Sequence, residues 1–195
     1  MARVGLTAER VALAAADLAD EVGFENVTVS ALARGFGVKD ASLYAHITSL
    51  RDLRARIAVR SAVEMADRLA AAVAGRAGKD ALLAFGDAYR DYARTHPGRY
   101  AAGQTRLDPD AVAEAAAHRP SCGDIVYAVL RAYGLAEPDL TDAARLMRAT
   151  FHGFVTLEAN GGFGHPRDVD ASWRRGLDAL HALLENWPGE DGVSA

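Results

Sequence analysis

The segment TVSALARGFGVKDASLYAHI, residues 28–47, decides the fold of this chain. Its first half favours a short helix, because Thr28 is a good N-cap and apolar residues follow at helical spacing as far as Phe36. Gly37 breaks that helix. A second short helix is expected from about Lys39 to Ile47, so two short helices meet at a glycine.

The second of these helices has the surface of an element that reads DNA. Val38 and Leu43 fix it to the first helix, and the small side chain of Ala33 lets the two backbones approach. Such a surface can enter the major groove and present small polar groups to base edges. Taken singly, a tyrosine or histidine here would more often be an ordinary core or surface residue. The surrounding pattern makes a role in DNA binding the favoured interpretation. The short exposed side chains are Asp40, Ala41, Ser42 and Ala45, and the longer ones are Lys39, Tyr44 and His46.

Helix signals continue on both sides of this segment, whereas strand signals are nearly absent. Thr7 can cap a first helix that ends at Gly23, and a long helix begins at Leu50 and ends near Gly75–Gly78. Half of the residues are hydrophobic, and long stretches lack proline. We therefore predict an all-α chain of nine helices. The five that follow Gly78 are expected at about 79–95, 108–118, 121–133, 139–160 and 168–187.

Length and charge predict two domains with different partners. The chain has 195 residues and a net charge of −4. Residues 1–60 hold eight Lys or Arg against seven Asp or Glu, a net +1, and the remainder holds fourteen against nineteen, a net −5. The acidic excess thus lies in the C-terminal part, and the N-terminal part is free to approach a phosphate backbone.

Cysteine usage and hydropathy point to a cytoplasmic protein. Cys122 is the single cysteine, so neither an intramolecular disulfide nor a cysteine metal cluster can form. Its position at a helix start could lower the pKa of its thiol, although a plain small residue is the simpler interpretation. No stretch has the length of a membrane span, and Met1 to Arg10 lacks the apolar core of a signal peptide.

The spacing of the motif residues in the segment 28–47 resembles that of the TetR family of repressors. The family pattern is a threonine-capped helix, an Ala-x-x-x-Gly-Val turn and Leu-Tyr-x-His followed by an apolar residue. The resemblance covers roughly residues 7–55, and the nine-helix plan extends it along the chain. Lys39 stands where relatives often have a capping Ser or Thr, and Leu50 where a phosphate-contacting Lys is common. The matching residues here are Thr28, Ala33, Gly37, Val38, Leu43, Tyr44, His46 and Ile47.

The resemblance implies which residues touch DNA. Thr28, Tyr44 and His46 would contact phosphates, which position the reading helix without specifying sequence. Asp40 could accept a hydrogen bond from cytosine, and an alanine methyl could touch thymine. One such helix offers few contacts, so a symmetric dimer on two half-sites is expected. The residues nearest the bases would be Ser30, Asp40, Ala41, Ser42 and Ala45.

A second stretch resembles the C-terminal signature of a TetR subgroup named for its Trp-His-Gly motif. It runs from Ala149 to Glu158 and continues at Gly161–Phe163. Phe151 replaces the tryptophan and keeps an aromatic side chain there.

The same region supplies candidates for a ligand site. Aromatic residues recur at helical spacing, which fits either a plain core or the lining of a pocket, and His152 could serve in either. Buried tyrosine hydroxyls need partners, which a polar cavity supplies more easily than a dry core. The candidate ligand-binding residues are Met65, Phe85, Tyr89, Tyr92, Tyr100, Tyr127, Met147, Phe151 and His152.

We therefore expect a helix-turn-helix DNA-binding domain of three helices at 1–50, a six-helix ligand-binding and dimerisation domain at 51–188, and a flexible tail at 189–195. The helices at 139–160 and 168–187 would pair with their symmetry mates in a four-helix bundle. The expected function is a homodimeric cytoplasmic transcriptional repressor that binds a palindromic double-stranded operator and is released by a small-molecule effector.

Two other classes of function compete with this one. An enzyme would need a convergent set of acids, bases or nucleophiles, and none has catalytic spacing here. A DNA-independent helical binding or scaffold protein would share the pocket and the bundle but would not bind duplex DNA in a salt-dependent way. Residues 160–166 superficially suggest a phosphate loop, but no strand precedes them, so a flexible connector is favoured. No cofactor and no metal site is expected.

Overall fold

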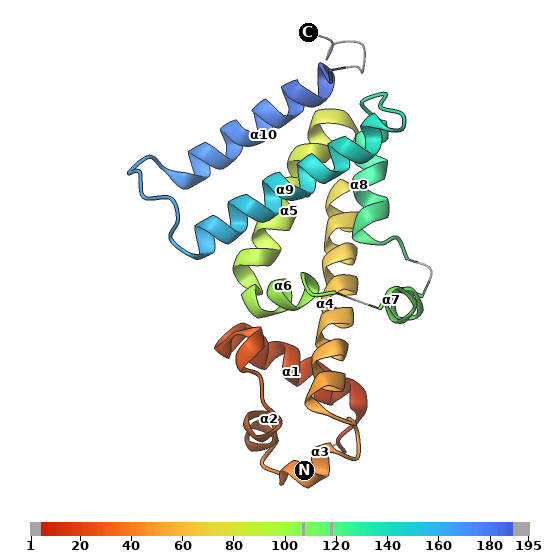
Figure 1. Ribbon diagram of the computed structural model, residues 1–195, viewed down its shortest axis with the longest axis vertical. Helices are drawn as coiled ribbons and strands as arrows, with labels where there is room; N and C mark the ends of the chain where they lie inside the picture. Colours follow the sequence, from red (N-terminus) through yellow and green to blue (C-terminus); the bar gives the residue numbers. More distant parts are fainter. Residues whose placement is uncertain (1–4, 107, 118, 189–195) are drawn as a thin grey trace. The chain divides into compact units, whose positions relative to one another are not determined.

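The computed structural model describes residues 5–106, 108–117 and 119–188, and these form ten α-helices and one 3₁₀ helix with no strand among them (Figure 1). The predicted all-α class is therefore confirmed. In chain order the elements are α1 (Ala8–Val22), η1 (Phe24–Asn26), α2 (Val29–Phe36), α3 (Asp40–Leu43), α4 (Leu50–Val73), α5 (Gly78–Thr95), α6 (Pro97–Gly103), α7 (Pro109–Ala116), α8 (Cys122–Arg131), α9 (Asp139–Ala159) and α10 (Val169–Glu185).

The helix count of nine was wrong because α6 was missed. Its start, His96-Pro97-Gly98, looks like a helix stop, since proline cannot continue a helix. Here Pro97 instead occupies the first turn of a new helix, where its missing N–H is no loss and its fixed φ is already helical. Residue 118, the end of one predicted helix, and the tail predicted for residues 189–195 lie outside the described residues.

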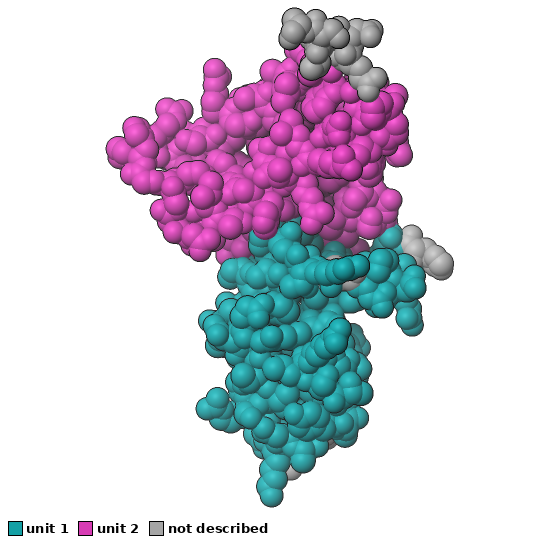
Figure 2. All heavy atoms as spheres, in the orientation of Figure 1, with its two compact units in different colours: residues 1–65, 95–119 teal, residues 66–94, 120–195 magenta. Residues whose placement is uncertain are grey.

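The chain divides into two compact units, coloured separately in Figure 2. The first comprises the residues up to Met65 together with Thr95–Arg119, and the second comprises Ala66–Arg94 and the residues from Pro120 onwards. The first unit therefore takes α6 and α7 from the middle of the chain. The domain bounds at residues 50 and 188 stay a prediction, because a compact unit is defined by contacts and a functional domain by what it binds.

The first unit is built on one apolar core beneath α1, α2 and α3. Apart from Phe24, its buried members are small or branched side chains, which lets short helices pack closely. Central among them, and 0–3% exposed, are Val11, Ala15, Leu32, Leu43 and Ile57. Because α2 and α3 each bury one side in this core, the opposite side of each is left to solvent.

A cluster of charges joins α6 to α1 inside the first unit. The buried Arg99 donates to Asp20 from its backbone at 2.8 Å and from Nη1 at 2.6 Å, and it also pairs with Asp17. Glu64 lies 3.5 Å from Arg99 Nε, and Nδ1 of His96 is 2.9 Å from Asp20 Oδ2. Burial lowers the pKa of Arg99, but the carboxylates outweigh it and the net pKa is raised.

The second unit is organised around aromatic rings and a buried arginine. Arg90, on α5, donates from Nε and Nη2 to Glu158 on α9 at 2.8 and 2.6 Å, and from Nη2 to Asp170 on α10 at 2.6 Å. Its guanidinium lies 5.6 Å from the Phe154 ring centroid and 5.4 Å from that of Trp173. Hydrogen bonds to Glu158 and Asp170 raise the pKa of Arg90, which stays charged. One side chain thus joins three helices.

None of the described helices combines the length and the apolarity that crossing a lipid bilayer requires.

Candidate nucleic-acid interface

The turn between α2 and α3 is fixed by capping at both ends of α2. Thr28 Oγ1 accepts a hydrogen bond from the Ala31 amide at 3.2 Å, as expected for an N-cap. At the other end Gly37 has φ 64° and ψ 34°, a left-handed conformation that glycine adopts at little cost. The Gly37 and Val38 amides donate to the carbonyls of Arg34 and Ala33, both at 3.0 Å. The chain therefore reverses directly into α3.

The residues around this turn present one side to the core and the other to solvent. Ala33 is 1% exposed and Leu43 is fully buried, in agreement with the packing roles expected for them. Tyr44 is 54% exposed, and His46 is half-buried. The other residues predicted to contact DNA are exposed, namely Thr28, Ser30, Lys39, Asp40, Ala41, Ser42 and Ala45.

A hydrogen bond joins the two helices at this surface. Ser30 Oγ, in the first turn of α2, donates to Asp40 Oδ2, in the first turn of α3, at 2.5 Å. Two residues predicted to lie near the bases are therefore in direct contact. The bond uses Oδ2 of Asp40.

The reading helix is shorter than predicted. The α-helix spans Asp40–Leu43, and Tyr44 and His46 stand on the turn that follows it. The amides of His46 and Ile47 both donate to the Leu43 carbonyl, at 2.8 and 3.1 Å, which closes that turn. The predicted helix end at Ile47 was wrong because side chains of Ser49 and Asp52 cap the start of α4 immediately afterwards.

The start of α4 is held by Ser49 and Asp52. The Asp52 amide donates to Ser49 Oγ at 3.0 Å, and the Thr48 amide donates to Asp52 Oδ2 at 2.8 Å. The hydrogen bond from Arg56 and the one from Thr48 lower the pKa of Asp52. The Ser-x-x-Asp spacing is the sequence signal that would have ended the preceding helix sooner.

Two cations beside this surface were missed from the sequence. Arg34, in the last turn of α2, and Arg51, in the first turn of α4, are exposed. Like Lys39, neither forms an ion pair with any residue that the structure describes, whereas Arg54 pairs with Glu25 at 3.3 Å. Their charges are therefore available to an anionic partner such as a phosphate backbone. Arg34 could have been predicted from the helical pattern, because it directly follows the buried Ala33 and therefore lies toward the solvent side of α2.

The candidate ligand residues divide between the two units. Met65 and Tyr100 belong to the first unit and the other seven to the second. Most are buried, and Tyr127 and His152 are half-buried. A role in ligand binding stays a prediction for all nine. Those in the second unit are Phe85, Tyr89, Tyr92, Tyr127, Met147, Phe151 and His152.

Three of these rings form one cluster. Phe151 lies 5.8 Å from Phe85 and 5.6 Å from Tyr89, measured between ring centroids, and 5.5 Å from Trp173. Gly86, between two of the rings along α5, admits this packing because a Cβ there would meet the Leu177 side chain at 2.7 Å. The aromatic residue in the Trp-His-Gly-like stretch therefore serves as the centre of a packed ring cluster.

Two tyrosine hydroxyls of this unit have polar partners. Tyr133, which the sequence did not single out, lies 3.0 Å from His181 Nδ1, and Tyr127 lies 3.4 Å from Thr141 Oγ1. Burial, with the nearby charge of Glu185, raises the pKa of Tyr133 to about 12.

The fold and the surface around the α2–α3 turn define a helix-turn-helix DNA-binding protein with an all-helical C-terminal region. Residues 13–59 match the family of bacterial regulatory proteins of the TetR type, and residues 82–180 match the tetracyclin repressor-like C-terminal domain. The chain belongs to the TetR family of transcriptional regulators and is not an enzyme. The Trp-His-Gly subgroup stays a prediction.

Curated relatives carry the same general description. The chain is 38% identical over 157 residues to the uncharacterized HTH-type transcriptional regulator Rv0681 of Mycobacterium tuberculosis, an alignment that covers 80% of this chain and 72% of the relative. It is 34% identical over 168 residues to the uncharacterized HTH-type transcriptional regulator YobS of Bacillus subtilis, covering 86% of each.

Solved structures share the fold. A protein of unknown function from Rhodococcus sp. RHA1 matches with a TM-score of 0.73 at 24% identity, over 92% of this chain and 96% of that one. A TetR variant from Acinetobacter baumannii AYE, solved in complex with minocycline, matches with a TM-score of 0.68 at 21% identity, over 95% and 100%.

Proposed function

We propose that this regulator is a repressor that binds a palindromic operator as a homodimer and leaves it when a small molecule binds. The observation that carries the proposal is the exposed surface after Gly37. It consists of a short helix and the turn after it, and Leu43 anchors this helix by burial in the core of the first unit. As a regulator that works on bacterial DNA, it would act in the cytoplasm.

The exposed side chains support a division of labour on DNA. Tyr44 and His46, together with Thr28, would donate to phosphates. Arg34 and Arg51, which form no ion pair with any described residue, would add charge. Phosphate contacts hold the reading helix in place without choosing a sequence.

Base contacts would come from the first turn of α3. Ser30 already donates to Asp40 Oδ2, so Oδ1 has the greater remaining capacity to accept from the cytosine amino group. Ser42 can exchange hydrogen bonds with a base edge, and the methyl of Ala41 or Ala45 can contact thymine. A reading head this small supports binding to two half-sites by a dimer.

The exposed sides of α9 and α10 support dimerisation. They carry Leu146, Leu157 and Leu183, which are 38–50% exposed although each is large and apolar. Between and beside them lie Gly153 and Gly176, where an added Cβ would meet nothing within 4 Å. α9 and α10 run side by side (Figure 1). Small residues flanked by leucines let a symmetry-related pair of helices approach closely.

An effector would act by binding one conformation of the dimer better than another. Coupling of about 1–3 kcal/mol between effector and operator is typical of such systems. The minocycline complex of a structural neighbour supports a small-molecule effector for this fold. The ring cluster around Phe151 and the half-buried His152 is the candidate site.

Fluorescence anisotropy with a labelled duplex from the DNA that flanks its own gene tests the DNA-binding role. Tyr44→Phe should weaken binding about tenfold on every sequence, whereas Ser42→Ala should change the ranking of base-substituted duplexes. Tyr133→Phe, which removes a hydroxyl from the second unit, is the matched control and should bind as wild type. A protein that binds no duplex at low salt, or whose binding ignores salt concentration, would favour a DNA-independent scaffold.

Light scattering coupled to gel filtration tests the dimer. Gly153→Arg places a long charged side chain on the exposed side of α9, so it should give monomers of intact helicity. Ala132→Arg, at the exposed end of α8, is the control and should stay dimeric. A dimeric Gly153→Arg variant would remove this interface from the proposal.

A further inference from the structure

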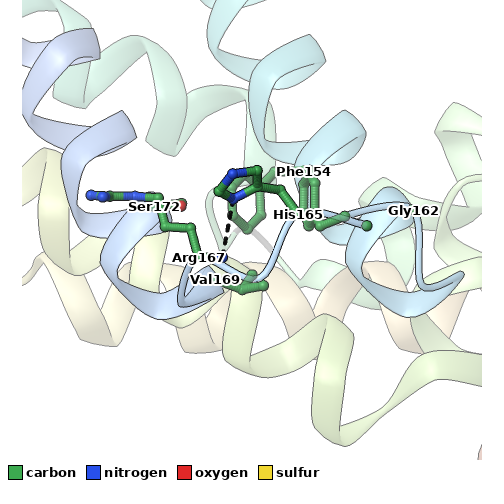
Figure 3. A pocket seen from close by; sticks show the side chains of 8 residues that line it. Phe154, Gly162, His165, Arg167, Val169 and Ser172 are labelled. Carbon is green, nitrogen blue, oxygen red and sulfur yellow. Dashed lines mark hydrogen bonds between the residues drawn. The ribbon is translucent and has the colours of Figure 1, made fainter.

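The connection between α9 and α10 forms one side of an open cavity. The cavity has a volume of about 370 Å³, within the roughly 300–1,000 Å³ typical of small-molecule sites. From the sequence this stretch is expected to be a flexible connector. Figure 3 shows residues of the connection and of both helices gathered around the cavity, with Phe154, Gly162, His165, Arg167, Val169 and Ser172 labelled. Phe163 also lines it.

One wall of the cavity is aromatic. The Phe154 and Phe163 rings lie 4.8 Å apart between centroids with an interplanar angle of 49°. Behind them, Trp173 packs against Phe154, also at 4.8 Å, and so holds that ring in place. Phe163 packs against Phe154 but is still 36% exposed, so a flat apolar ligand would find part of its ring to cover.

The polar groups at the cavity favour an anion. His165 Nδ1 accepts a hydrogen bond from the Arg167 amide at 3.1 Å (Figure 3), so in the neutral imidazole the proton resides on Nε2 as a donor. The Arg167 guanidinium has no ion pair or hydrogen bond with any residue that the structure describes. The lining includes no acidic residue. A guanidinium presents paired donors that match a carboxylate.

The two acidic side chains that flank Val169 are already engaged by other partners. Asp168 Oδ1 accepts from the Ala171 amide at 2.8 Å as the N-cap of α10. Asp170 is bound by Arg90, whose hydrogen bond and charge lower the pKa of that carboxyl. Neither acid lines the cavity, so the charge of Arg167 remains for a ligand.

From this juxtaposition of two phenylalanine rings with an arginine and a histidine donor, we infer that the cavity binds aromatic monocarboxylates. The ring of the ligand packs on Phe154 and Phe163, and its carboxylate accepts from Arg167 and His165. The lining of this cavity includes none of Phe85, Tyr89 and Phe151, the rings proposed for the effector, although Trp173 packs against both Phe151 and Phe154. The proposed carboxylate site does not depend on the proposed repressor function.

Isothermal titration of the full-length protein with 2-naphthoate tests this site. The matched neutral probe is 2-naphthalenemethanol, which keeps the rings and replaces the carboxylate. We expect 2-naphthoate to bind at least about tenfold more tightly than the alcohol, because the alcohol cannot pair with a guanidinium. Equal binding of the two probes, or no binding of 2-naphthoate, would overturn the inference, including the case in which a second copy of the chain covers the cavity.

Three variants locate the binding. Arg167→Gln and Phe163→Ala should each weaken 2-naphthoate binding by about tenfold, and Arg131→Gln, which removes an exposed arginine at the end of α8, should not change it. Circular dichroism checks that each variant is folded. Undiminished affinity in both folded cavity variants would move the bound naphthoate to another site and refute the assignment.

Discussion

Gly98 is the position at which one methyl group should disturb the first unit most. A Cβ added there would lie 1.9 Å from the Ala19 carbonyl oxygen and 2.6 Å from the Asp20 amide nitrogen. Both atoms belong to the backbone of α1, so no side-chain rotation can relieve the overlap. Ordinary contact begins near 3.4 Å, so in Gly98→Ala the α1 and α6 backbones must separate by about 1.5 Å, the difference between 3.4 and 1.9 Å.

The separation breaks contacts whose cost can be assigned. The hydrogen bond from the Arg99 amide to Asp20 Oδ1 would lengthen from 2.8 Å to about 4.3 Å. A hydrogen bond to a charged group contributes about 1.5–3 kcal/mol, and the Arg99 guanidinium would lose part of its pairing as well. Alanine returns at most about 1 kcal/mol of helix propensity. We expect the free energy of unfolding to fall by about 3 kcal/mol.

Urea denaturation followed by far-ultraviolet circular dichroism measures this change at one fixed protein concentration, because the stability of any protein that self-associates depends on its concentration. The control is Gly103→Ala on the same helix, where an added Cβ meets nothing within 4 Å. It should leave stability unchanged or raise it by up to about 1 kcal/mol. A Gly98→Ala protein within about 0.5 kcal/mol of wild type would refute the close packing of α6 on α1.

Three further predictions concern the second unit. Arg90→Leu should lower the free energy of unfolding by about 3 kcal/mol in urea denaturation, because Glu158 would keep its charge without its partner, and a loss below about 1 kcal/mol would contradict this. Burial raises the pKa of Cys122 to about 11, so its alkylation by iodoacetamide should still accelerate above pH 9, and a rate that levels off at or below pH 9 would count against the burial. Ser121→Ala should cost about 1 kcal/mol and raise the pKa of Asp124, which Ser121 hydrogen bonds hold below its usual value. The stabilisation linked to that lowered pKa is present at neutral pH and is lost as the pH falls through it, so an NMR titration with an unchanged Asp124 pKa in the variant would contradict the cap.

Local patterns in the sequence were sufficient for most of the helices. Helix α2 was predicted with its observed bounds because its N-cap Thr28 and its terminating Gly37 act through bonds within a few residues. Helix α6 was missed because Pro97 has two opposite meanings, a stop inside a helix and a start in its first turn. Choosing between them depends on what the new helix packs against.

Contacts between distant segments could not be predicted in the same way. Arg90 is separated from Glu158 by 68 residues and from Asp170 by 80, and no spacing rule pairs residues so far apart. The aromatic residues at 85, 89 and 151 were found by periodicity, yet periodicity cannot distinguish a ring cluster from a pocket wall. The cavity beside Phe163 likewise depends on how a connector folds back on two helices.

The residues expected to face DNA were predicted as a set; all are exposed except His46, which is half-buried, and their contact with DNA stays a prediction. What the sequence did not supply was the length of α3, since the helical pattern continues through Tyr44 to Ile47. The observed end at Leu43 places Tyr44 and His46 on the turn that follows the reading helix. The Ser30–Asp40 bond was also unforeseen, because it joins two helices across the turn.

Dimethyl sulfate protection on an operator fragment from the flank of its own gene tests the central claim most directly. The reagent methylates guanine N7 in the major groove and adenine N3 in the minor groove, so it reports which groove is filled. The account predicts protection of guanine N7 in two clusters about one helical turn apart, and loss of that protection when Leu43 is replaced by aspartate. Protection confined to adenine N3, or none on a fragment that the protein demonstrably binds, would contradict it.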